Sequence, residues 1–164
     1  MLEPMNARTA SAQVGFTLTE MLIVVAVAAV LLTVAVPSFR PLFAKWRLEG
    51  AANELSADLQ YARSQAVADS ANVTFSTTNS STYSITGNQA YKTVTLPTGV
   101  TVNHPASVTF LSQRGCTNAT CSATDVSFIL ANAQVAGTLQ LTVNNMGRVR
   151  LCSPSGTIKG YPTC

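Results

Sequence analysis

The sequence has few charged residues and only one histidine. Only 10% of its 164 residues are charged, against about 25% in an average soluble domain. Its one histidine, His104, lies between Asn103 and Pro105 in a predicted turn, without the partners of a Ser–His–Asp arrangement. A glycine-rich phosphate loop and a histidine-rich metal pattern are also missing from the sequence. We therefore expect no enzymatic activity, no cofactor and no metal.

Acidic residues are nearly absent from the second half of the chain. Residues 70–164 contain one acid, Asp125, and five basic side chains, which leaves a net charge of +4 (five minus one). Residues 38–69 contain four basic and four acidic side chains and are neutral overall. The excess positive charge therefore lies in the distal half, which favours an anionic partner there.

The longest apolar stretch runs from Phe16 to Val36, 21 residues with Glu20 as their only charge and with no glycine or proline. An α-helix of that length covers about 30 Å, the thickness of the hydrocarbon core of a bilayer. A secretory signal would have a shorter apolar core, of about 7–15 residues, and a cleavage site after it. A plain membrane anchor fits the length but gives no reason for a carboxylate near its start, which lipid disfavours.

The residues at the start of this stretch resemble the processing site of type IV prepilins and pseudopilins. Gly15 directly precedes the apolar Phe16, and Glu20 is the fifth residue after the glycine. In that family a dedicated prepilin peptidase cuts after the glycine and N-methylates the new first residue. The resemblance implies a leader of residues 1–15 that is removed and a transmembrane and assembly helix over residues 16–37. It also implies that Glu20 pairs with the amino terminus of a neighbouring subunit during assembly.

We expect the helix to continue beyond the apolar stretch. Pro37 and Pro41 each remove an amide donor and are expected to bend or loosen the helix rather than end it. Spacings of four and three residues then predict one apolar stripe of an amphipathic helix that ends near residue 69: Leu48, Ala52, Leu55, Leu59, Ala62 and Ala66. Three charged side chains lie off this stripe and are expected to face water: Glu54, Asp58 and Arg63.

After the helix the pattern changes to short β-rich runs separated by polar turns. Eight strands are predicted, near residues 72–76, 83–86, 92–96, 100–102, 108–111, 126–130, 139–143 and 148–152. Antiparallel hairpins of these strands are expected to form a sheet that packs on the apolar stripe. The predicted fold class is α+β: a long N-terminal helix, half in the membrane and half amphipathic, packed against an antiparallel β-sheet in a globular domain of residues 38–164.

Several segments resemble the GspH/FimT branch of minor pilins and pseudopilins. They are residues 55–66 followed by Asn72-Val-Thr-Phe, the segment Phe110-Leu-Ser-Gln-Arg-Gly115, and the late segment Gly147-Arg-Val-Arg-Leu-Cys152. The resemblance implies the type IV pilin fold and other major and minor pilins as partners. It also implies a single-pass protein of the bacterial inner membrane, with its C-terminal domain in the periplasm, that later joins a pilus at the cell surface.

All four cysteines lie after residue 115, in the part of the chain that this resemblance places outside the cytoplasm. Disulfides are the expected state in such a compartment. The spacing suggests that Cys116 pairs with Cys121 and Cys152 with Cys164, one of three possible connectivities. A zinc site made by all four thiolates is the alternative, but the spacings match no common zinc motif.

The segment Gly147-Arg148-Val149-Arg150 carries the main binding hypothesis. In a hairpin of the last two predicted strands, Gly147 can adopt the positive φ that such turns require. Val149 then faces the core, and the two arginines project together from the other face, about 6.8 Å apart along the strand. Two guanidiniums at that spacing can contact neighbouring backbone phosphates without reading base sequence. Lys159 and Arg114 would extend the basic patch if the fold brought them close.

In the FimT branch, a Gly-Arg-x-Arg motif in the C-terminal region is associated with DNA binding during natural transformation. Gly147, Arg148 and Arg150 match that motif position by position. The simpler interpretation is a solvated strand face, or arginines that pair with acids on another pilin.

These observations lead to one main hypothesis: a minor type IV pilin that assembles into the pilus or its tip complex and binds DNA non-specifically for uptake in natural transformation. One alternative is a structural minor pilin that primes pilus assembly without binding DNA. The other is a minor pseudopilin of a type II secretion system. The paired arginines and the cysteine-tied tail favour the main hypothesis.

Overall fold

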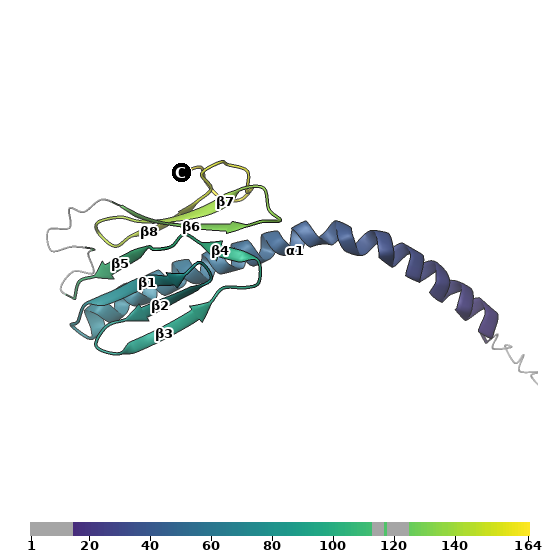
Figure 1. Cartoon of the computed structure of the whole chain (residues 1–164), viewed down its shortest axis with the longest axis horizontal. Helices are drawn as coiled ribbons and strands as arrows, with labels where there is room; N and C mark the ends of the chain where they lie inside the picture. The colour runs from purple at the N-terminus through teal and green to yellow at the C-terminus, as the bar shows by residue number, and fades with distance from the viewer. Residues whose placement is uncertain (1–14, 113–116, 118–124) are drawn as a thin grey trace, which may run out of the picture. The chain divides into compact units, whose positions relative to one another are not determined.

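The computed structural model describes residues 15–112, 117 and 125–164. In this part of the chain one helix, α1 (Leu18–Ala68), is followed by eight strands (Figure 1): β1 (Val73–Asn79), β2 (Thr82–Thr86), β3 (Ala90–Thr95), β4 (Val100–Val102), β5 (Ser107–Phe110), β6 (Val126–Asn132), β7 (Thr138–Val143) and β8 (Val149–Cys152). The chain divides into two compact units, Met1–Ser38 and Phe39–Cys164. Helix α1 begins in the first unit and ends in the second.

The apolar stretch forms the first part of helix α1, and its large side chains are mostly more than half exposed, among them Leu22, Ile23, Val30 and Leu31. Among the described residues, no single helix is both long and apolar enough to cross a membrane. A bent pair of helical segments, Leu18–Thr33 and Ala35–Ala68, meets these two requirements when taken together. Neither Pro37 nor Pro41 ends the helix, as predicted.

In the second unit, the rest of α1 contributes one apolar face to the core. All six residues of the predicted stripe are fully buried: Leu48, Ala52, Leu55, Leu59, Ala62 and Ala66. The helix ends at Ala68, close to the predicted end. Ser70 adopts a positive φ of 49°, and the N–H of Ala71 donates a hydrogen bond to the carbonyl oxygen of Ala66 at 3.2 Å. A left-handed residue with such a bond is a common way to end a helix.

The strands form two four-stranded antiparallel sheets rather than the single sheet that was expected. The first sheet has the order β3-β2-β1-β5 and the second the order β4-β6-β7-β8. Strand β4 pairs with β6, whereas β5, which follows β4 in the chain, pairs with β1. All eight strands occur near their predicted positions, and β1 extends further than predicted, to Asn79. The alternation of side chains predicts a strand but not its partner, and this is why the expectation of one sheet was wrong.

Aromatic side chains join the two sheets in one core. Phe75 from β1 stacks on Tyr83 from β2, with ring centroids 4.9 Å apart, and meets Phe128 from β6 edge-on at 5.1 Å. Inward-facing residues of both sheets and the buried stripe of α1 belong to the same cluster. The helix and the two sheets therefore share a single hydrophobic interior, which lies entirely in the second unit.

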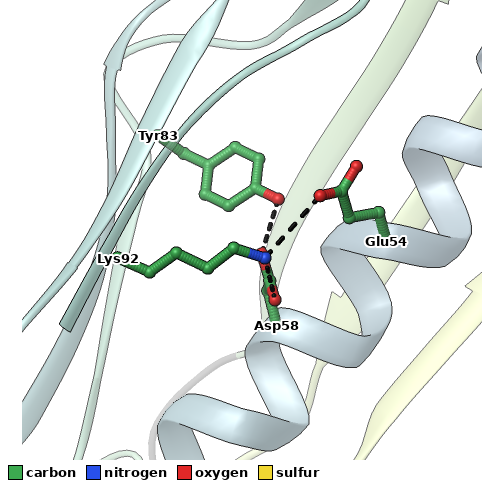
Figure 2. A network of polar contacts seen from close by, with 4 residues as sticks. All are labelled: Glu54, Asp58, Tyr83 and Lys92. Carbon is green, nitrogen blue, oxygen red and sulfur yellow. Dashed lines mark hydrogen bonds and ion pairs between the residues drawn. The ribbon is translucent and has the colours of Figure 1, made fainter.

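The prediction that Asp58 faces water is wrong. Its side chain is only 6% exposed and is held between helix α1 and the first sheet (Figure 2). The hydroxyl of Tyr83 donates a hydrogen bond to Asp58 Oδ2 at 2.7 Å, and Lys92 Nζ donates to both carboxylate oxygens at 2.8 Å. Glu54 is exposed, as predicted, and lies 3.6 Å from Lys92 Nζ. A buried carboxylate is tolerated when it is both paired and hydrogen-bonded, and here both partners come from strands distant in sequence.

Candidate functional site

The candidate processing site lies just before helix α1. Gly15 and Phe16 precede the helix, and the Phe16 side chain is 77% exposed. The backbone N–H of Glu20 donates a hydrogen bond to Thr17 Oγ1 at 3.2 Å, so Thr17 caps the helix. A threonine followed three residues later by a glutamate is the spacing of a capping box, a signal that can be read from the sequence. Glu20 therefore lies in the first turn, where the positive end of the helix dipole stabilises a carboxylate.

The second candidate region is the hairpin between β7 and β8. Val143 and Val149 are paired across it, and the N–H of Gly147 donates a hydrogen bond to the carbonyl oxygen of Asn144 at 2.9 Å. Gly147 has a φ of 71°, the positive value predicted for it. Asn144 Oδ1 accepts hydrogen bonds from the N–H groups of Met146 at 3.1 Å and Arg148 at 2.8 Å. Asn144 thus fixes the backbone of the turn, a role that asparagine in a turn signals.

The two arginines of the motif are both exposed, but only one lies in a strand. Strand β8 begins at Val149, so Arg148 belongs to the turn rather than to the predicted strand. Arg150 lies opposite Thr142 on the outward face of the sheet. Val149, as predicted, and Leu151 alternate with it and pack against the core. Among the described residues no ion pair joins Arg148, Arg150 or Lys159 to an acid.

Arg150 also lines a shallow pocket of about 180 Å³ between the sheet and the C-terminal tail. Its lining residues are Asp125, Thr142, Arg150, Leu151, Cys152, Pro162, Thr163 and Cys164. Asp125 is the one acid of the distal half, and its position in the sequence does not predict that it lies near the motif. Its carboxylate lowers the positive potential beside Arg150 and reduces the attraction for an anion there.

A disulfide between Cys152 and Cys164 ties the tail to the end of β8. The N–H of Ser153 donates a hydrogen bond to the carbonyl oxygen of Pro162 at 2.8 Å, and Ile158 is buried in the core. The tail also packs against the turn between β6 and β7, where a methyl group on Gly137 would collide with Thr157 Oγ1. Lys159 is exposed on this tied segment.

Three predicted residues, Arg114, Cys116 and Cys121, lie outside the described residues. Among those that are described, no group of three or more His, Cys, Asp or Glu side chains is arranged to hold a metal ion. His104 is exposed, and its Nδ1 lies 2.8 Å from the carbonyl oxygen of Thr77. The neighbouring Asn103 accepts a hydrogen bond from the N–H of Ile129 at 2.7 Å. The turn around His104 therefore bridges the two sheets, which is a structural role.

Comparison with known families finds a match for the N-terminal segment and another for the globular part of the chain. The model of the family described as type II transport protein GspH matches residues 51–147, more than half of the chain. The model described as the prokaryotic N-terminal methylation motif matches residues 11–36. No curated protein matches the chain.

Two crystal structures of the type IV minor pilin FimU from Pseudomonas aeruginosa strain PAO1 resemble this structure with a TM-score of 0.54. One is 22% identical over 68% of this chain and 92% of its own. The other is 23% identical over 68% of this chain and 98% of its own. At this identity the likeness concerns the fold. The chain belongs to the GspH family, carries the prokaryotic N-terminal methylation motif, and has the type IV pilin fold.

Proposed function

We propose that this protein is a minor type IV pilin that assembles into the pilus or its tip complex and binds DNA through the β7–β8 hairpin for uptake in natural transformation. The observation that carries the DNA-binding part is the pair of exposed arginines, Arg148 and Arg150, beside a turn fixed by Gly147 and Asn144. Both belong to a Gly-Arg-x-Arg pattern, which in the FimT branch is associated with DNA binding. Lys159 is the third exposed cation of the described distal part that could join them.

The chemistry of these side chains supports sequence-independent binding. Guanidinium groups donate paired hydrogen bonds to phosphate oxygens, and such contacts hold DNA without reading its bases. Asp125 beside Arg150 and the small number of cations make the expected affinity of one subunit weak. Several copies, or neighbouring pilins, would raise the overall affinity through multivalency.

Assembly is assigned to the N-terminal region. Cleavage after Gly15 creates a new amine at Phe16, a cation at the start of the same helix that carries Glu20. A carboxylate in an apolar filament core must be paired with a cation. The amine of a neighbouring subunit supplies that cation in this proposal, while before assembly the chain's own amine and the positive end of the helix dipole lie close to Glu20.

A second candidate function is that of a minor pseudopilin in a type II secretion system. The family description, type II transport protein GspH, favours it, because that description names secretion rather than a pilus. The two functions share the processing site and the fold, so they differ in the partners of the globular part. A pseudopilin has no need for exposed arginines that bind DNA, and the DNA-binding experiment therefore also bears on this choice.

The test is a gel shift on the fragment Phe39–Cys164, which contains the whole hydrophobic core. The double variant Arg148→Gln/Arg150→Gln should bind DNA much more weakly than the wild type. The control Arg40→Gln/Arg47→Gln removes the same charge from exposed positions on helix α1 and should bind as the wild type does. Equal binding by both double variants, or none by the wild-type fragment, would contradict the proposal.

The salt dependence and one further variant sharpen this test. With about three to five phosphates neutralised, the logarithm of the binding constant should fall against that of the salt concentration with a slope of about −3 to −5. The double variant should lower the magnitude of that slope by about 2.

Asp125→Asn removes the one acid beside Arg150 and should tighten binding. A deletion strain that still takes up DNA normally would leave a structural pilin or a pseudopilin as the function.

A further inference from the structure

Four large apolar side chains are exposed on helix α1 where the second unit begins. Phe39 and Phe43 are each 51% exposed, Leu42 is 40% exposed and Trp46 is 54% exposed. Their spacing of three, one and three residues puts them on one face of the helix. We call these four residues the aromatic stripe. The rings of Phe43 and Trp46 meet edge-on with centroids 5.5 Å apart, so part of the stripe is already ordered.

The aromatic stripe lies on the opposite side of the helix from the core. At about 100° per residue, its centre is roughly half a turn from that of Ala44, Leu48 and Ala51. Those three residues are buried under the sheets. The fold therefore covers one apolar face of this helical segment and leaves the other in contact with solvent. Contiguous exposed apolar surface of this kind marks an interaction site.

The stripe is short and has positive charge beside it. Beyond Trp46 the same face continues with Gly50, Asn53, Ala57 and Gln60, all exposed, and its next large apolar side chain is Tyr61, 15 residues after Trp46. Arg40 and Arg47, seven residues apart, lie together on one flank of the stripe and are both exposed. No ion pair to either arginine occurs among the described residues, whereas Lys45 pairs with Glu49 at 3.6 Å.

We infer that the aromatic stripe docks on the surface of the membrane, at the level of the lipid headgroups, while the protein is still anchored there before assembly. This inference rests on the proposed function, in which the pilin is anchored in the membrane by its apolar stretch before assembly. The stripe begins only three residues after the apolar stretch that ends at Val36, and the 21 residues of that stretch, as a straight helix, would be about as long as the hydrocarbon core is thick. Tryptophan and arginine next to the end of a membrane segment are typical of the interface, and the two arginines complement anionic lipids.

Docking sets a condition on the direction of the helix. Trp46 is ten residues beyond Val36, which is about 15 Å along a helix axis and more than the depth of one headgroup layer. The segment with the stripe must therefore lie along the membrane surface, with its apolar face inward, as amphipathic interfacial helices do. Pro37 and Pro41 remove two backbone donors at this junction and permit the necessary change of direction.

The sequence provides its own probe, because Trp46 is the only tryptophan. The full chain is reconstituted in vesicles that contain phosphatidylglycerol, and Trp46 emission is measured with lipids brominated near the headgroup end of their acyl chains. We expect blue-shifted emission, strong quenching by these lipids and little quenching by aqueous iodide. Arg40→Gln/Arg47→Gln should weaken the quenching by the brominated lipids several-fold.

The matched control moves the probe along the same helix. In Trp46→Phe/Gln60→Trp the tryptophan is 14 residues further on at an exposed position, about 21 Å away. It should be quenched by iodide and not by the brominated lipids. Protection of Trp46 that is lost when the protein is diluted in lipid, without quenching by brominated lipids, would instead assign the stripe to a second copy of the chain and overturn the inference.

Failure of the inference is distinguishable from failure of the anchor. Flotation of the vesicles on a density gradient reports whether the chain inserts. A chain that floats with the vesicles but whose Trp46 is open to iodide and unaffected by brominated lipids keeps its anchor and refutes docking. A chain that does not float with the vesicles refutes both the anchor and the docking.

Discussion

Lys92 Nζ lies 2.8 Å from both carboxylate oxygens of Asp58, so the outermost strand of the first sheet, β3, is bonded directly to helix α1. Tyr83 on β2 donates a further hydrogen bond to the same carboxylate. The Asp58–Lys92 ion pair, partly shielded from water, therefore joins β3 to the helix, and the Tyr83 hydrogen bond joins β2 to it. The contribution of this pair to stability is open to direct measurement.

Lys92→Met should lower the free energy of unfolding of the fragment Phe39–Cys164 by about 1–2 kcal/mol, because it leaves the mostly buried Asp58 carboxylate without its cation. The loss is smaller than for a fully buried pair, since Lys92 is partly exposed and water screens its charge. Urea denaturation measures the change. Glu54→Gln is the control and should change stability by less than about 0.5 kcal/mol. Equal decreases in the free energy of unfolding for Lys92→Met and Glu54→Gln would show that the Asp58–Lys92 pair contributes no more than an exposed pair.

Stability should fall at alkaline pH, and Tyr83 should cause part of the fall. Burial raises the pKa of the Tyr83 phenol, and its hydrogen bond to Asp58 raises that pKa further. Above about pH 10, the normal pKa of a tyrosine, the unfolded chain loses the phenol proton while the folded state keeps it. The contribution of this phenol to the free energy of unfolding is therefore complete below about pH 10 and is lost as the pH rises. The hydrogen bond to Asp58 likewise raises the pKa of Lys92 and acts in the same direction.

Tyr83→Phe isolates the part that the phenol contributes. Between about pH 10 and pH 11 the free energy of unfolding of this variant should fall by about 1 kcal/mol less than that of the wild type, because the unfolded phenol loses most of its proton over this interval. Urea titrations at a series of pH values provide the measurement. Parallel pH profiles for the two proteins would contradict the assignment.

Gly147→Ala should destabilise the β7–β8 hairpin by about 1–2 kcal/mol, because a φ of 71° is unfavourable for a residue with a β-carbon. Gly147→Asn should cost less, since asparagine tolerates the left-handed region. Thermal unfolding ranks the variants. In the gel shift Gly147→Ala should also weaken DNA binding, because the turn positions Arg148. Equal melting temperatures for Gly147→Ala and Gly147→Asn would show that the backbone of the turn can adopt another φ at this position.

Cys152→Ser/Cys164→Ser should lower the free energy of unfolding by about 3 kcal/mol, the loop-closure value for a bridge between residues 12 apart. The released tail should also be cut faster by trypsin at Lys159. Wild-type protein under oxidising conditions is the control for both measurements. A trypsin cleavage rate at Lys159 that stays unchanged would mean that packing of Ile158, rather than the disulfide, holds the tail in place.

Glu20→Gln should reduce the amount of this protein in sheared pili, as measured by immunoblotting, because in the proposed function its charge pairs with the amino terminus of a neighbouring subunit. Thr17→Val is the matched control. It removes only the helix cap, whose hydrogen bond to Glu20 measures 3.2 Å, and should leave assembly nearly intact. If both variants assemble equally poorly, Glu20 acts through the start of the helix and not through a neighbour.

The local elements of this fold could be predicted from the sequence, whereas their partners could not. The buried stripe from Leu48 to Ala66 and the eight strands follow from side-chain periodicity, which is a property of the chain over a few residues. The pairing of Thr74 with Thr109, or of Thr101 with Ala131, joins residues some thirty positions apart. No periodicity encodes such a choice, and the division into two sheets therefore appears only in the structure.

The same limit explains what was missed around the candidate sites. Asp58 lies at the edge of the apolar stripe, and its position on the helix gives no sign that Tyr83 and Lys92 will cover it. Asp125 is equally unremarkable in the sequence, yet it lines a pocket with Arg150. Gly147 and the hairpin around it were predictable because glycine in a turn has a local physical cause.

The alternation of β4 and β5 between the two sheets sets the order in which each sheet can be completed as the chain emerges with its N-terminus first. The first sheet has all its strands once β5 has appeared, at Phe110. At that moment β4 has no partner, because β6 begins only at Val126. The second sheet cannot be complete before β8 has appeared, and the bridge cannot form before Cys164 has. The hairpin with the two arginines is thus completed only when the rest of the domain already exists to support it.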